Sequence, residues 1–148
     1  MPDTPEPLRT ETLLAFDFGH RRIGVAVGQQ ITASARPLGT ASNGPSGPDW
    51  PRISRWVDEW QPDRLVVGLP LHADGTPSDL SEDTLGFVND LARFERPIES
   101  VDERYSSLEA REILKRERAS GRRGRIDKET IDATAAMLIA ERWLSQNS

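Results

Sequence analysis

Acidic residues stand at three places in the sequence where a buried core or the end of a strand is expected. Asp17 lies within an apolar run, Asp102 and Glu103 follow the last predicted strand, and Asp132 lies one turn into the final predicted helix. A carboxylate in such a position is costly unless it is paired, hydrogen-bonded or bound to a metal. Two strand ends and a helix start could bring these acids together.

The chemistry that such a cluster could perform depends on a divalent cation, because neighbouring carboxylates repel one another without one. The sequence has no Cys and only two His, which excludes a thiolate site and disfavours a zinc site. Oxygen ligands on separate rigid elements suit Mg²⁺ or Mn²⁺. Two such ions can activate a water and stabilise the leaving oxygen in phosphodiester hydrolysis.

Each acid also has an ordinary structural explanation when it is taken alone. Asp17, two residues before a glycine, can form a turn. Asp102 and Glu103 can belong to a solvated turn with local ion pairs. Asp132 can offset the dipole of its helix. The residues by themselves leave these alternatives open, and we interpret His20 as a turn residue with no ligand role.

The elements that would position these acids follow from apolar patterns. Residues 13–18 and 22–28 flank a short turn and predict a β-hairpin. A third, weaker strand is expected over residues 31–38 and a loop over 40–48, which is rich in Gly, Ser, Asn and Pro. Periodicity predicts further strands over 64–70 and 97–102 and helices over 49–60, 80–94, 106–118 and 128–144. This order predicts a mixed α/β sheet flanked by helices, with sites at strand ends.

Size and charge limit the other possibilities. The chain of 148 residues suits one domain, which we place at residues 12–148 after an acidic, Pro-rich and disordered lead-in over residues 1–11. No apolar run reaches membrane-spanning length and the start is unlike a signal peptide, so a cytoplasmic location is expected. The net charge of −5 argues mildly against nucleic acid. However, residues 115–125 contain six basic residues and one acid. This segment could bind phosphates or only increase the solubility of the chain.

Four segments together resemble the YqgF family, also called RuvX, of the RNase H-like superfamily. They are Ala-Phe-Asp-Phe-Gly (15–19) with Arg-Arg-Ile-Gly-Val-Ala (21–26), Val-Val-Gly-Leu-Pro-Leu (66–71) with Asp-Gly-Thr (74–76), Asp-Glu-Arg-Tyr-Ser-Ser (102–107) and Ile-Asp-Ala-Thr-Ala-Ala (131–136). Each segment is weak evidence alone, but four in this order and spacing are specific. The resemblance covers residues 13–144 and implies an RNase H-like fold with a five-stranded mixed sheet flanked by helices.

The resemblance also implies the site. Asp17 matches the acid of the first strand, Glu103 the second acid, with Asp102 as its neighbour, and Asp132 the acid of the last helix. Asp17, Glu103 and Asp132 would then bind Mg²⁺ or Mn²⁺, and Asp102 would orient or assist. Related junction resolvases carry the second acid on the preceding strand, where residues 66–70 here read Val-Val-Gly-Leu-Pro. The YqgF arrangement therefore fits better.

The function implied by the resemblance is metal-dependent endonucleolytic cleavage of structured RNA, namely processing of the 5′ end of pre-16S rRNA in ribosome biogenesis. The expected partners are this RNA, other structured nucleic acid or a pre-ribosomal particle, and the chain would act as a monomer or weak homodimer. We expect three arginines to contact phosphates near the cut, namely Arg21, Arg22 and Arg104. Three more should contact the duplex backbone, namely Arg122, Arg123 and Arg125.

Three other functions stay open from the sequence. The first is cleavage of four-way (Holliday) DNA junctions, by analogy with the resolvases. The second is a non-catalytic module that binds rRNA. The third is an ATP-binding relative of the actin and sugar-kinase fold, because Asp17, Gly19 and Gly24 resemble a phosphate-binding hairpin, although one domain is too short for that architecture. Convergence of Asp17, Glu103 and Asp132 would favour a nuclease.

Overall fold

The computed structural model describes residues 11–69, 81–102, 106–119 and 128–147. Its elements in chain order are β1 (Thr12–Phe18), β2 (Arg22–Gln29), β3 (Ser34–Gly44), β4 (Gly47–Pro48), α1 (Trp50–Trp60), β5 (Arg64–Leu69), α2 (Ser81–Asp90), the 3₁₀ helix η1 (Leu91–Phe94), β6 (Ile98–Asp102), α3 (Ser106–Ala119) and α4 (Lys128–Gln146). The sheet has the order β4-β3-β2-β1-β5-β6. The β1, β2, β3 and β4 strands are antiparallel neighbours, whereas β1, β5 and β6 run parallel. The predicted α/β class with a mixed sheet is confirmed.

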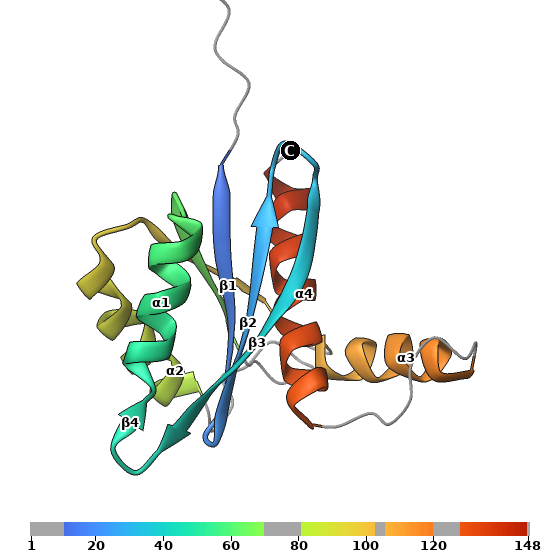
Figure 1. Ribbon diagram of the computed structural model, residues 1–148, viewed down its shortest axis with the longest axis horizontal. Helices are drawn as coiled ribbons and strands as arrows, with labels where there is room; N and C mark the ends of the chain where they lie inside the picture. Colours follow the sequence, from blue (N-terminus) through green and yellow to red (C-terminus); the bar gives the residue numbers. More distant parts are fainter. Residues whose placement is uncertain (1–10, 70–80, 103–105, 120–127, 148) are drawn as a thin grey trace, which may run out of the picture.

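Helices cover the sheet on its two faces. Figure 1 shows α1 and α2 on one side of the central strands and α4 on the other, with α3 projecting away from the lower part of α4. The two faces carry separate apolar clusters, because side chains alternate along a strand. On β1, Leu14 and Phe16 pack in the cluster on the α1 side, whereas Leu13 and Ala15 pack against α4. The central strands are therefore buried on both faces.

The predicted hairpin is confirmed. The whole of β1 pairs antiparallel with residues 23–29 of β2, with Asp17 opposite Gly24 and Phe18 opposite Ile23. The β5 strand is buried on both faces as its apolar run predicts, since Leu65 belongs to the α1-side cluster and Val66 to the α4-side cluster.

A third strand follows the hairpin as predicted, but its bounds and the loop after it were predicted wrongly. The strand expected over 31–38 begins at Ser34 and continues to Gly44, and Ile31 is 72% exposed in the turn before it. Most of the expected loop over 40–48 is strand, because residues 40–42 pair with β2 and the two-residue β4 pairs with the end of β3. Cross-strand hydrogen bonding overrides a composition that favours turns. The short β4 also raises the strand count from five to six.

The predicted helices agree with the structure more closely than the third strand does. Asp49 caps α1 by accepting a hydrogen bond from the Arg52 backbone nitrogen at 3.2 Å, and a proline lies in the first turn. The helix predicted over 80–94 is divided into α2, which ends at Asp90, and η1, and residue 80 lies outside the described chain. Within the described residues, none of the helices combines the length and the apolar character that crossing a membrane requires.

Candidate active site

Asp17 lies next to the last residue of β1, on the face of the sheet that α4 covers. Its place follows from strand alternation, because Leu13 and Ala15 of the same strand pack against α4. Unlike those two residues, Asp17 is half-buried. A carboxylate at this strand end can therefore meet solvent, a ligand and the N-terminal half of α4.

Gly24 brings α4 onto this part of the sheet. It pairs with Asp17 across the hairpin, and a Cβ atom at Gly24 would overlap the carbonyl group of Asp132 and lie 3.0 Å from the Ala133 nitrogen. Only a residue without a side chain permits such a close approach of helix backbone to strand backbone. The glycine thus sets the position of Asp132 in the second turn of α4.

An open pocket joins these elements at the turn between β1 and β2. Its volume is about 300 Å³, and it is lined by Asp17, Gly19, His20, Arg21, Arg22 and Asp132. The structure thus brings together two of the three acids proposed as metal ligands and two of the arginines proposed to contact phosphate. Acidic and basic groups from a strand end, a turn and a helix share one solvent-accessible hollow.

Arg22 and Asp132 form an ion pair in this pocket. The Arg22 Nε donates to Asp132 Oδ2 at 2.9 Å, and the two side chains are 29% and 25% exposed. The pairing joins residues 110 positions apart, and sequence analysis assigned the two residues to separate roles. No local signal predicts it, because the contact depends on how α4 packs against β2.

His20 makes a contact that sequence analysis also missed. Its Nε2 lies 2.8 Å from Asp83 Oδ2 at the start of α2, and both side chains are well exposed, at 63% and 60%. The interaction links the turn between β1 and β2 to the opposite helical layer. His20 therefore closes one side of the pocket, in addition to its expected place in a turn.

Of the remaining predicted site residues, the structure describes only Asp102. Asp102 ends β6, its carbonyl oxygen accepts a hydrogen bond from Arg142 of α4, and it is not among the residues that line the pocket. The parallel strands β1, β5 and β6 end at the same edge of the sheet, with β5 between the other two. Five predicted residues lie outside the described chain: Glu103, Arg104, Arg122, Arg123 and Arg125.

The donor set that the structure describes is suited to a hard cation. Asp17 and Asp132 contribute carboxylate oxygens from separate elements to one pocket, and such ligands favour Mg²⁺ or Mn²⁺ over softer metals. Within the described residues, no group of three His, Asp or Glu side chains lies close enough to hold a metal. A complete site would need a further ligand, and the third predicted acid, Glu103, follows β6 outside the described residues.

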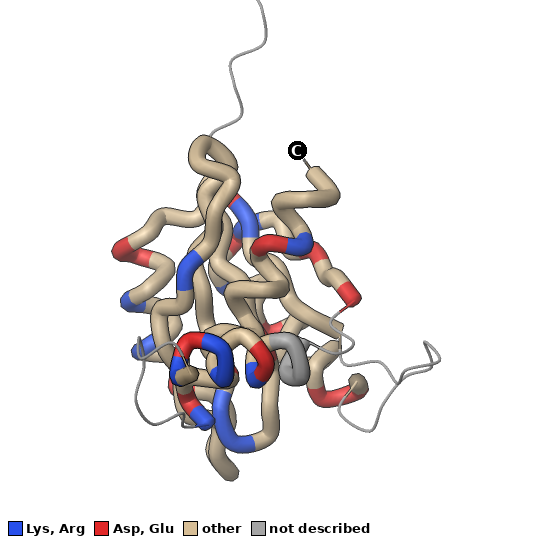
Figure 2. The backbone as a smooth tube through the Cα atoms, turned by 90° about the vertical axis from the view of Figure 1, so that its right-hand side faces the viewer, with Lys and Arg blue, Asp and Glu red and all other residues tan. Residues whose placement is uncertain are grey.

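The charges around the pocket are mixed. Figure 2 shows basic and acidic positions interspersed along the described chain, with both signs on α3. The adjacent Arg21 and Arg22 stand at the turn between β1 and β2, beside the two acids of the pocket. These two guanidinium groups give the pocket a local attraction for phosphate.

Comparison with known proteins finds a matching family model and relatives that share one name. The model of the RuvX family, described as Holliday junction resolvase, matches residues 11–146. A protein of Xanthomonas oryzae pv. oryzae (strain PXO99A) named "Putative pre-16S rRNA nuclease" is 44% identical over 146 residues, covering 98% of this chain and 94% of its own. A protein of the same name from Burkholderia lata is 46% identical over 141 residues, covering 95% and 93%.

Solved structures with a similar fold are more distant in sequence. RuvC of T. thermophilus in complex with a Holliday junction substrate aligns with a TM-score of 0.53 at 17% identity, covering 93% of this chain and 95% of that one. The Fowlpox virus resolvase in complex with Holliday junction DNA aligns with a TM-score of 0.55 at 8% identity, covering 92% and 98%. At these identities the likeness concerns the fold alone.

Proposed function

The chain belongs to the RuvX family, and from this membership and the geometry of the pocket we propose that it is a metal-dependent endonuclease that hydrolyses phosphodiester bonds in structured RNA. The observation that carries the proposal is that Asp17 and Asp132, from the first strand and the last helix, line one open pocket together with Arg21 and Arg22. A binding module would not need two carboxylates beside the groups that attract phosphate, since they would repel its ligand.

We propose Asp17, Glu103 and Asp132 as the ligands of Mg²⁺ or Mn²⁺, with Asp102 assisting from the neighbouring strand end. When bound, the cation would supply activation of a water and charge stabilisation at the phosphate. Arg22 donates a hydrogen bond to Asp132 Oδ2, and this bond would orient the Asp132 carboxylate toward a cation.

The basic residues would bind and orient the substrate. Arg21 and Arg22 lie in the wall of the pocket, where a guanidinium can make paired hydrogen bonds to a phosphate. Arg22 has a second effect, because its bond to Asp132 limits the orientations of that carboxylate. The other arginines of the proposal, Arg104 near the cut and the group formed by Arg122, Arg123 and Arg125 on the duplex backbone, would add contacts that carry no sequence information.

The proposed substrate is pre-16S rRNA, cleaved at its 5′ end, as free RNA or within a pre-ribosomal particle. It is supported by the name of relatives that are 44% and 46% identical over almost the whole chain. Four-way DNA junctions are the second candidate, favoured by the description of the family and by the substrates in the complexes of RuvC and the Fowlpox virus resolvase. We also propose that residues 12–148 form one nuclease domain that acts in the cytoplasm as a monomer or weak homodimer.

The test is cleavage of an end-labelled pre-16S rRNA fragment with Mg²⁺ or Mn²⁺, with a four-way DNA junction alongside. We compare the wild type with Asp17→Asn, which keeps the size of the side chain and removes its charge. Asp58→Asn, an exposed carboxylate on α1, is the matched control.

RNA cleavage that is lost only in Asp17→Asn would support the proposal. Cleavage of the junction alone would favour the resolvase. If wild type and Asp17→Asn bind the RNA equally and neither cleaves it, the non-catalytic module becomes the better explanation.

A further inference from the structure

A row of residues crosses the sheet from the candidate active site to its open edge. Asp17 pairs with Gly24 of β2, and Gly24 pairs with Thr40 of β3. Residues directly opposite one another in antiparallel strands have side chains on the same face, so Thr40 shares the α4 side with Asp17. Two strand spacings separate them by about 10 Å, a span of a few stacked nucleotides at about 3.4 Å each. One strand of nucleic acid could therefore touch both positions.

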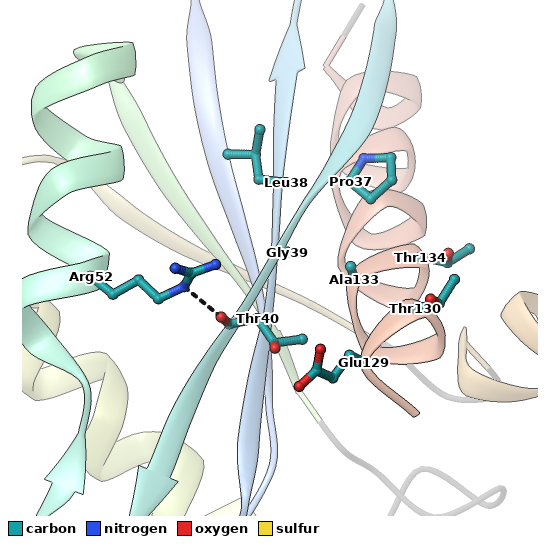
Figure 3. A pocket seen from close by; sticks show the side chains of 9 residues that line it. All are labelled: Pro37, Leu38, Gly39, Thr40, Arg52, Glu129, Thr130, Ala133 and Thr134. Atoms are coloured by element: carbon teal, nitrogen blue, oxygen red, sulfur yellow. Dashed lines mark hydrogen bonds between the residues drawn. The ribbon is translucent and has the colours of Figure 1, made fainter. Parts of the chain in front are cut away.

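A second pocket lies at the edge end of this row. It has a volume of about 320 Å³ and includes Thr40, Arg52, Glu129, Thr130, Ala133 and Thr134 in its lining; we call it the edge pocket. Figure 3 shows Arg52 reaching from α1 and Glu129 from α4 toward Thr40 on β3. Asp132 of the candidate active site and Ala133 of the edge pocket are consecutive on α4, so the two pockets are neighbours.

Arg52 is held in position at the edge. Its Nε donates to the Thr40 carbonyl oxygen at 2.7 Å, and its guanidinium lies 4.6 Å from the centre of the Trp56 ring. This bond and this stacking order the side chain before any ligand arrives, which lowers the entropic cost of binding. Within the described residues, neither Nη group has a hydrogen-bond partner, and these groups suit a phosphate oxygen.

The opposite wall offers groups that recognise hydroxyls. Glu129 is exposed, and its carboxylate accepts hydrogen bonds but donates none when ionised. The Thr40 hydroxyl beside it can donate or accept. A cation on one wall and a carboxylate on the other match a group that is anionic at one end and bears hydroxyls at the other.

We propose that the edge pocket binds the ribose and phosphate of an RNA nucleotide flanking the cut, with Arg52 on the phosphate and Glu129 accepting a hydrogen bond from the ribose 2′-hydroxyl. This inference rests on the proposed nuclease function and assigns a place where the chain would distinguish RNA from DNA. The 2′-hydroxyl distinguishes RNA from DNA at such a contact. With DNA, the Glu129 carboxylate would gain no hydrogen bond and would still repel the backbone, so the pocket selects against DNA as well as for RNA.

The experiment measures binding without divalent metal, in EDTA at low salt, so that cleavage plays no part. Fluorescence anisotropy gives the Kd of a 12-nucleotide single-stranded RNA and of DNA of the same sequence. The test variants are Glu129→Ala and Arg52→Ala, and their controls are Glu59→Ala and Arg55→Ala, which remove the same charges from exposed positions of α1. Circular dichroism confirms that each variant is folded.

We expect the wild type to prefer RNA and Glu129→Ala to reduce the RNA-to-DNA preference about tenfold, the effect of one hydrogen bond to a charged group. Arg52→Ala should weaken RNA and DNA binding alike, and more than Arg55→Ala does. Equal binding of RNA and DNA by the wild type, or a preference that Glu129→Ala leaves unchanged, would overturn the inference. In that case the nuclease proposal would still hold if Asp17→Asn abolishes a metal-dependent cleavage. Conversely, a preference for RNA that depends on Glu129, without any cleavage, would support the edge pocket and contradict the nuclease proposal.

Discussion

The close approach of α4 to Gly24 gives the sharpest prediction about how the fold builds its site. A methyl group at this position would overlap the Asp132 carbonyl and lie 3.0 Å from the Ala133 nitrogen. Both neighbours are backbone atoms, which cannot rotate away as a side chain would. Since nonbonded carbon atoms prefer separations of about 3.5–4.0 Å, the Gly24→Ala substitution requires α4 to move by roughly 1 Å.

Two effects of different size should follow from this movement. Overpacking typically costs about 1–3 kcal/mol, which for a chain of this length lowers the Tm by roughly 3–10 °C. The displaced helix also carries Asp132 away from Asp17, and a misplacement of about 1 Å at a catalytic group can lower the rate about 100-fold. We therefore expect a variant that is folded at 25 °C and has lost most of its RNA cleavage.

Gly86→Ala is the matched control, because Gly86 is exposed on α2 and, apart from neighbouring residues of its own helix, no described atom lies within 4 Å of a Cβ built there. It should raise the Tm slightly, since alanine is favoured over glycine inside a helix by about 0.5–1 kcal/mol. The measurements are thermal unfolding followed by circular dichroism and the cleavage assay described above. A Gly24→Ala variant with wild-type Tm and wild-type cleavage would refute the argument that this glycine positions the helix.

Three further predictions concern single side chains. Arg22→Ala should weaken RNA binding about fivefold, because one phosphate contact is lost. Mn²⁺ binding, measured by calorimetry, should be unchanged or tighter, because the guanidinium that holds Asp132 also repels a cation. Loss of Mn²⁺ binding would show instead that Arg22 is needed to orient Asp132. Partial burial raises the pKa of Glu141, an exposed residue of α4, above its ordinary value of 4.5. The folded state therefore binds this proton more tightly, and a small amount of stability is lost as the pH rises above that value. Glu141→Gln should raise the Tm slightly at pH 7 but not at pH 4, and an equal gain at both would contradict this. Arg64 Nη2 donates a hydrogen bond to Glu11 Oε1 at 3.2 Å, and this bond raises the pKa of Arg64. Glu11→Ala should lower the Tm by a few degrees at most, and 1 M salt should remove the difference because it is electrostatic.

Local patterns were sufficient where the structure depends on local physics. Two apolar runs of strand length on either side of a short turn predicted the hairpin and therefore the strand end on which Asp17 lies. The helical period of the apolar residues predicted α1 and α4. The same reasoning failed at residues 40–44, where the sequence is rich in turn formers but pairing with β2 and β4 determines the backbone.

The resemblance to a family went further than periodicity, because it assigned roles to Asp17 and Asp132 that a single carboxylate does not reveal. The structure places both in one pocket, while their roles as metal ligands stay predictions. Glu103, the third assigned acid, lies outside the described residues.

The sequence by itself determined the order and type of most elements and the positions of the acids along them. Only the tertiary structure decided which groups meet: Arg22 with Asp132 across 110 residues, His20 with Asp83, and Arg52 with the open edge of β3. Secondary structure follows from hydrogen bonds and apolar spacing within a few residues, whereas these contacts follow from strand register and from the distance at which helices pack on the sheet. Those quantities depend on the whole core, and Gly24 is the position where one residue sets such a distance.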